Sequence, residues 1–155
     1  MNRDTLHHVY VLGDQLSLQV GPLSRLNPSK TVVLMVESLE RGRSVPFHKQ
    51  KLGLVYSAMR HFKLELEAAG FRVNYQSCAK WIEGVQAHLE QYPGAKLLLM
   101  QPADFGVDAV LQTMIETHGG TLEVVPNELW LSSEADFDSF EIGRASCRER
   151  VCLAV

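Results

Sequence analysis

Five short runs of apolar, β-prone residues constrain the fold of this chain more than any other feature. They cover residues 8–12, 31–36, 72–75, 96–100 and 122–125. Runs that are apolar almost throughout, instead of alternating with polar residues, are typical of strands buried on both faces of a parallel sheet. The sequence therefore predicts a central sheet of five parallel strands.

Segments with helical spacing separate most of these runs. Over residues 49–69 apolar side chains recur every three or four positions, and Gly70 follows where helices commonly end. Residues 81–89 and 107–115 have the same spacing, whereas the 13–31 link contains Gly-Pro and Asn-Pro pairs that leave room only for a short helix. This alternation predicts an α/β fold: a doubly wound, Rossmann-like five-stranded parallel sheet with helices on both faces.

Composition and missing motifs exclude several classes of protein. A chain of 155 residues with 46% hydrophobic content suits one domain with a real core. The net charge of −3 gives no basic excess for nucleic acid binding by this chain alone. No apolar run approaches the roughly 18 residues that span a bilayer, and the start does not resemble a signal peptide, so we expect a cytoplasmic protein without membrane contact. Neither a GxGxxG, a phosphate-binding loop nor a GxSxG motif occurs.

The C-terminal residues differ in character from the rest of the chain. Residues 141–152, EIGRASCRERVC, resemble the in-frame translation of a sequencing adapter. We therefore expect an α/β domain over 1–131, the start of a linker over 132–140, and a non-native tail over 141–155. The alternative is a genuine basic tail whose arginines contact phosphate. Its two cysteines lack the partners of a metal site, and three cysteines in the whole chain argue against a disulfide framework.

Polar residues follow the first two predicted strands. Ligands of doubly wound sheets bind beyond the carboxyl ends of the strands, at the point where the strand order reverses. Asp14 and Glu37 are placed to accept hydrogen bonds there, Gln15 to donate and accept, and Gly13 to allow close approach. The alternative is that Asp14 caps a turn and Glu37 is solvated. The hypothesis requires the two acidic loops to converge at this edge.

Three further segments are weaker candidates. His48 and Lys49 precede or begin the long helix, where they either face a polar or anionic ligand or form a solvated first turn. Arg60 either has a surface role or pairs with Glu65 or with another domain. Within residues 101–105, after the fourth strand, Asp104 or Gln101 contacts a ligand, or Pro102 and Asp104 serve the turn.

Five segments together carry a family resemblance. In order along the chain they are VLGDQLS at 11–17, MVES at 35–38, HKQKL at 48–52, SAMRHF at 57–62 and NELWLS at 127–132. Their combination and order resemble the start of the deoxyribodipyrimidine photolyase-related proteins, the bacterial photolyase/cryptochrome branch that carries an iron–sulfur cluster. The resemblance covers about residues 7–140.

The resemblance implies a function that spacing alone does not. In that family the N-terminal α/β domain holds an antenna chromophore, a ribityl-lumazine, which passes excitation energy to FAD in a following helical domain. The flavin then repairs pyrimidine photoproducts in damaged DNA, typically of the (6-4) type, or serves blue-light sensing. The residues implied in antenna binding are Gly13, Asp14, Gln15, Leu16, Val36, Glu37 and Ser38.

The chain also departs from the family pattern. The helical FAD domain and the four 4Fe-4S cysteines are not in this sequence, so we expect no catalytic residues here. Only the full-length protein would bind damaged DNA. If that protein is a photolyase, it is a carbon–carbon lyase. Residues 101–105 differ from the Glu-Pro-Gly-type loop of the family. The remaining alternative is a stand-alone α/β protein that binds a nucleotide or another small molecule, or a purely structural domain.

Overall fold

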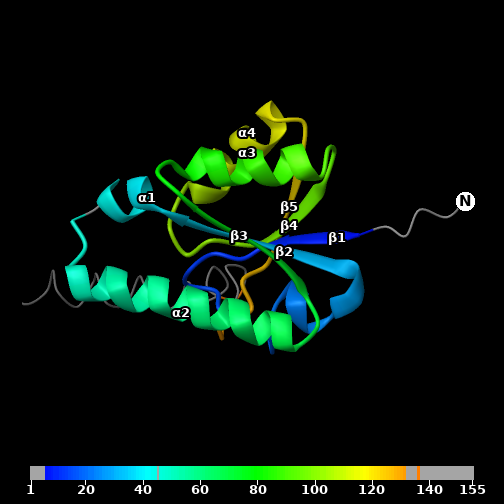
Figure 1. Ribbon diagram of the computed structural model, residues 1–155, viewed down its shortest axis with the longest axis horizontal. Helices are drawn as coiled ribbons and strands as arrows, with labels where there is room; N and C mark the ends of the chain where they lie inside the picture. The colour runs from blue at the N-terminus through cyan, green and yellow to red at the C-terminus, as the bar shows by residue number, and fades with distance from the viewer. Residues whose placement is uncertain (1–5, 45, 132–135, 137–155) are drawn as a thin grey trace, which may run out of the picture.

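The five predicted strands form one all-parallel sheet. The computed structural model describes residues 6–44, 46–131 and 136. In this part of the chain the sheet has the order β3-β2-β1-β4-β5 (Figure 1). Its strands are β1 (His7–Tyr10), β2 (Thr31–Ser38), β3 (Arg72–Cys78), β4 (Lys96–Met100) and β5 (Thr121–Val125). The predicted α/β, Rossmann-like fold class is confirmed.

Helices cover both faces of the sheet. The long helix α2 (Lys49–Ala68) lies against one face, and α3 (Trp81–Gln91) and α4 (Val107–Thr117) lie against the other (Figure 1). Successive side chains of β2 point to opposite faces, so Val33 and Met35 join the core under α2 while Leu34 and Val36 join the core under α3 and α4. All eight residues of β2 are buried, because a central parallel strand is covered on both sides.

The connections from β1 to β2 and from β2 to α2 contain short helical turns. Between β1 and β2 lie two 3-10 helices, η1 (Pro22–Ser24) and η2 (Pro28–Lys30), as the prediction of only a short helix there required. Leu23 of η1 is buried in the core on the α2 side, so this link completes the cover of that face. The short helix α1 (Leu39–Ser44) follows β2 directly and was not predicted.

The strand ends differ from the prediction at one informative place. β2 continues to Ser38 because it pairs with β3 as far as Ser38 opposite Cys78, and Glu37 lies opposite Ser77. Glu37 and Ser38 therefore belong to the strand itself, not to a loop after it. β1 ends earlier than predicted, at Tyr10.

The strand order reverses at β1, which lies between β2 and β4. This is the switch point at which the carboxyl ends of neighbouring strands diverge and leave room for a ligand. The predicted linker at 132–140 and tail at 141–155 lie outside the described residues, apart from Asp136. No helix in the described ranges is both long and apolar enough to cross a bilayer.

Candidate functional site

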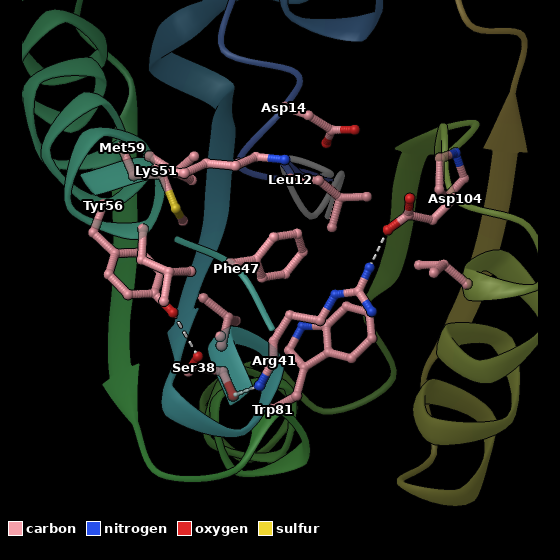
Figure 2. A pocket seen from close by; sticks show the side chains of 17 residues that line it. Leu12, Asp14, Ser38, Arg41, Phe47, Lys51, Tyr56, Met59, Trp81 and Asp104 are labelled. Carbon is pink, nitrogen blue, oxygen red and sulfur yellow. Dashed lines mark hydrogen bonds and ion pairs between the residues drawn. The ribbon is translucent and has the colours of Figure 1, made fainter. Parts of the chain in front are cut away.

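A cavity of about 280 Å³ lies at the carboxyl-end edge of the sheet, at the switch point (Figure 2). It is close to the smallest volume typical of small-molecule sites, about 300 Å³. Its lining comes from the ends of β1, β2 and β4 and from all four α-helices or their flanking turns. The lining residues are Leu12, Gly13, Asp14, Val36, Ser38, Arg41, Gly42, Phe47, Lys51, Leu52, Val55, Tyr56, Met59, Trp81, Pro102, Asp104 and Val107.

Two features of the loop after β1 bring it to the cavity. At Gly13 a β-carbon would lie only 3.0 Å from Cγ1 of Val55 and 3.1 Å from the sulfur of Met59, so glycine lets the backbone approach α2. The side-chain amide of Gln15 donates to the carbonyl of Met100 at 2.9 Å and to that of Gln101 at 3.1 Å. The loop after β1 is thereby tied to the end of β4.

Ser38 forms a polar part of the lining together with Tyr56. The phenol of Tyr56 donates to the carbonyl of Ser38 at 2.9 Å, and the Ser38 hydroxyl accepts from the backbone N–H of Arg41 at 3.3 Å. Burial, followed by the negative charge of Glu37, raises the pKa of Tyr56, so the phenol remains a donor. Among the described residues the Ser38 hydroxyl proton has no assigned acceptor, which leaves it available to a ligand.

Aromatic side chains supply the apolar part of the lining. The indole N–H of Trp81 donates to the hydroxyl of Tyr10, which is 1% exposed and whose pKa is raised by burial. This bond fixes the Trp81 ring at the start of α3. Phe47 projects into the cavity in Figure 2, and the ammonium of Lys51 lies 4.8 Å from the centre of its ring.

Charged groups of both signs meet at the cavity. The guanidinium of Arg41 forms an ion pair with Asp104 and lies 5.7 Å from the centre of the Trp81 ring (Figure 2). Asp14 and Lys51 also line the cavity. The lining thus carries two carboxylates and two cations, with no net formal charge.

Glu37 has a different environment from the one predicted. Its carboxylate accepts from Arg60 at 2.7 Å and 3.0 Å and from the hydroxyl of Tyr75 at 2.6 Å, and it does not line the cavity. Burial alone would raise the pKa of Glu37, but the bonds from Arg60 and Tyr75 and the charge of Arg60 outweigh it, so the pKa is lowered. The predicted convergence of two acidic loops is not observed. Arg60 pairs with Glu37 of β2 instead of with Glu65 of its own helix, and its side chain, 62% exposed, has the surface position that was expected.

Strand parity explains the contact between Glu37 and Arg60. Glu37 follows Met35 by two positions, so its side chain points to the face covered by α2, whereas Val36 and Ser38 point to the other face. Because β2 extends through these residues, their side chains must alternate between the two faces of the sheet, which residues in a loop would not have to do.

The seven predicted site residues therefore separate into two sets. Gly13, Asp14, Val36 and Ser38 line the cavity. Gln15 is buried and bonded to the end of β4, Leu16 packs against the core on the α2 side, and Glu37 is bonded to Arg60 and Tyr75.

The weaker candidates also separate. Asp104 lines the cavity, whereas His48 caps α2 by accepting from the backbone N–H of Gln50 at 3.2 Å. Sequence reasoning missed Arg41, Phe47 and Trp81. The available signals were a basic residue about three positions after β2 and a tryptophan about three positions after β3, since both strands end at this edge.

Two comparisons relate this chain to known proteins. A family model described as deoxyribodipyrimidine photo-lyase-related protein matches residues 9–150. A (6-4) photolyase of Agrobacterium fabrum (strain C58 / ATCC 33970) is 25% identical over 144 residues. The alignment covers 89% of this chain and 28% of the length of that relative.

Proposed function

This chain belongs to the deoxyribodipyrimidine photolyase-related proteins, and from that premise we propose that its described residues form the pigment-binding domain of a light-driven DNA-repair flavoprotein. The resemblance read from the sequence is confirmed at the level of the family. Because the chain spans 28% of its photolyase relative, repair of a (6-4) lesion, the FAD and cluster sites, and contact with DNA are proposed for a longer protein, as is the alternative of blue-light sensing.

One observation carries this proposal: an aromatic, charge-balanced cavity lies at the switch point of the sheet. A ribityl-lumazine is an uncharged ring system with a polar chain. Flat apolar surfaces suit the ring, and a few fixed polar groups suit its N–H and carbonyl edges. A lining without net charge favours such a ligand, since an unpaired charge beside it would be costly to desolvate.

The residues present fit this ligand class. Trp81 and Phe47 offer aromatic surface, and Asp14 and Ser38 offer an acceptor and a donor to the ring edge (Figure 2). When bound, the lumazine would absorb light and pass excitation energy to the flavin of the longer protein. The task of this chain would be to bind the ring, orient it and shield it from water.

The seven predicted site residues have distinct parts in the proposal. Gly13, Asp14, Val36 and Ser38 contact the ligand, because they line the cavity. The others support that lining, since Gln15 and Leu16 hold the loop after β1 and Glu37 holds the adjacent face of α2 through Arg60.

Titration of the chain with 6,7-dimethyl-8-ribityllumazine, followed by ligand fluorescence, tests the proposal. Saturable binding is expected. Asp14→Asn removes a charged hydrogen-bond acceptor and is expected to weaken binding about tenfold. Glu65→Gln, which makes the same charge change on the exposed side of α2, is the matched control. Absence of saturable binding, or coinciding curves for Asp14→Asn and the wild type, would contradict the proposed site.

A further inference from the structure

The ion pair between Arg41 and Asp104 joins two elements on different sides of the cavity. Arg41 belongs to α1, after β2, and Asp104 belongs to the turn between β4 and α4. Both residues line the cavity, and Figure 2 shows the Arg41 side chain extending from α1 towards Asp104. The pair therefore bridges the edge where the strand order reverses.

The backbone of Arg41 is fixed, whereas its guanidinium group is only weakly held. The backbone of α1 is anchored by the N–H of Glu40, which donates to Ala79 at 2.9 Å, and by the Glu40 carboxylate, which accepts from the N–H of Trp81 at 3.1 Å. The ion pair itself is open to solvent, since the side chains of Arg41 and Asp104 are 39% and 67% exposed. Such pairs are weak and screened by salt, so the Arg41 side chain can swing aside while α1 remains in place.

Charge balance at the cavity depends on the same pair. Asp104 compensates Arg41, and the remaining lining charges are Asp14 and Lys51. Among the described residues no carboxylate forms an ion pair with Lys51, whose ammonium lies over Phe47 instead. If Asp104 lost its charge, the lining would carry a net positive charge, with the uncompensated guanidinium of Arg41 beside the Trp81 ring.

We propose that the Arg41–Asp104 pair is a charge-compensated strap that shields the Trp81 side of the cavity and makes the cavity selective for an uncharged ligand over an anionic one. The selectivity rests on the proposed function, whereas the shielding and the local charge can be measured without any ligand. Opening the strap exposes the Trp81 ring. Removing Asp104 leaves a cation beside that ring, and removing Arg41 leaves a carboxylate.

Quenching of Trp81 fluorescence tests the strap directly. The sequence has two tryptophans, so Trp130→Phe in the 155-residue chain leaves Trp81 as the only one. Acrylamide, which is uncharged, measures access to Trp81, and iodide at constant ionic strength measures access for an anion. Asp104→Asn and Arg41→Gln are both expected to raise the acrylamide quenching constant, because each one opens the strap.

The ratio of the iodide constant to the acrylamide constant separates charge from access. We expect Asp104→Asn to raise this ratio about twofold to threefold and Arg41→Gln to lower it by a similar factor, as one unit charge near the ring implies. Glu123→Gln makes the same change of net charge in the exposed pair with Lys96, away from the cavity, and is expected to leave both constants unchanged.

The outcomes are distinct from those of the lumazine titration. Unchanged acrylamide constants in both strap variants would overturn the strap. The role of the strap in charge selection would be overturned by any of three results for the iodide-to-acrylamide ratio: no change in either strap variant, a change in the same direction in both, or an equal change in Glu123→Gln. A wild-type chain that binds no lumazine would contradict the proposed function. The quenching experiment would still test the strap, because it needs no ligand.

Discussion

The two ends of the sheet both carry polar side chains, but in opposite circumstances. At the amino end of β1, His8 and His88 are 6% and 0% exposed, and Nδ1 of His8 lies 3.1 Å from Nε2 of His88. Asn74 bonds the other nitrogen of His88 at 3.0 Å. At the carboxyl end, Arg41 and Asp104 form a solvent-exposed pair beside a cavity. The histidines at the amino end are hydrogen-bonded within the protein, whereas the Arg41–Asp104 pair at the carboxyl end is accessible to a ligand.

Hydrogen bonding at the amino end defines the proton positions. The oxygen of the Asn74 amide accepts from Gln76, and its nitrogen donates to Gln91 at 3.2 Å and therefore also to His88 Nδ1. His88 then carries its proton on Nε2 and donates it to Nδ1 of His8, so both rings are neutral. Buried polar groups that satisfy one another in this way specify a fold. The comparison therefore predicts that the histidine pair at the amino end contributes more to stability than the Arg41–Asp104 pair does, whereas binding depends on the cavity at the carboxyl end.

His88→Ala is expected to show the largest effect. It removes a fully buried side chain, leaves a void beside the Tyr92 ring, and deprives His8 and Asn74 of a partner. A loss of about 2–4 kcal/mol in the free energy of unfolding is expected, measured by urea denaturation at pH 7. His61→Ala on the exposed side of α2 is the control and should change stability by less than about 0.5 kcal/mol. Equal losses for the two variants would contradict the assignment of stability to the amino end.

The same cluster predicts a pH dependence. Burial, then the electrostatic effect of the nearby His8 ring, lowers the pKa of His88 to about 4. Burial, then His7 and Arg72, lowers the pKa of His8. Below pH 6.5 the unfolded chain therefore binds protons that the native chain does not, and the free energy of unfolding falls as the pH drops from 6.5 towards 4. For His88 the loss reaches at most about 3 kcal/mol.

Urea denaturation between pH 7 and pH 4.5 measures this slope. His88→Gln, which does not titrate, is expected to show a shallower decline than the wild type. Glu37 does not interfere, because its lowered pKa confines its own contribution to more acidic solutions: that stability is present above its unfolded pKa and is lost as the pH falls through its folded pKa. Parallel slopes for the two proteins would show that the histidine pair is not the acid-sensitive element.

Glu37→Gln is expected to lower the free energy of unfolding by less than His88→Ala does, and to leave ligand binding almost unchanged. The substitution removes the charge that pairs with Arg60, whose side chain is 62% exposed, and weakens the bond from Tyr75. A loss of about 1–2 kcal/mol in stability is expected, with little change in lumazine affinity because Glu37 does not line the cavity. Lys63→Gln, which breaks the exposed pair with Glu67 on the same helix, is the control. A tenfold loss of affinity without a loss of stability would restore Glu37 as a direct ligand contact.

These contrasts also show what the sequence could predict. Apolar runs and helical spacing were enough for the sheet and for α2, α3 and α4. The hydrophobic pattern is clearest in β1, β2 and β4, most of whose residues are buried, whereas the edge strands β3 and β5 contain no buried residue. The strand β3 was predicted too short, because its second half, through Cys78, is polar and is held by pairing with β2. Of the predicted residues in the loop after β1, only Gly13 and Asp14 line the cavity, and Arg41 and Trp81 meet only after α1 and α3 pack together. No local pattern encodes that contact.

The smallest stability effect is expected at the strap. Asp104→Asn breaks an ion pair whose carboxylate is 67% exposed, and it leaves the backbone bonds of α1 to Ser38 and Ala79 intact. Exposed pairs contribute about 0–1 kcal/mol, so urea denaturation should give almost the same free energy of unfolding for this variant and for the wild type. The difference should be smaller at 0.5 M salt than at 0.05 M, because salt screens the ion pair. Glu123→Gln, in the pair with Lys96, provides the matched exposed carboxylate. A loss above 2 kcal/mol would make Arg41 and Asp104 part of the structural framework, and the distinction between a closed amino end and an available carboxyl end would fail.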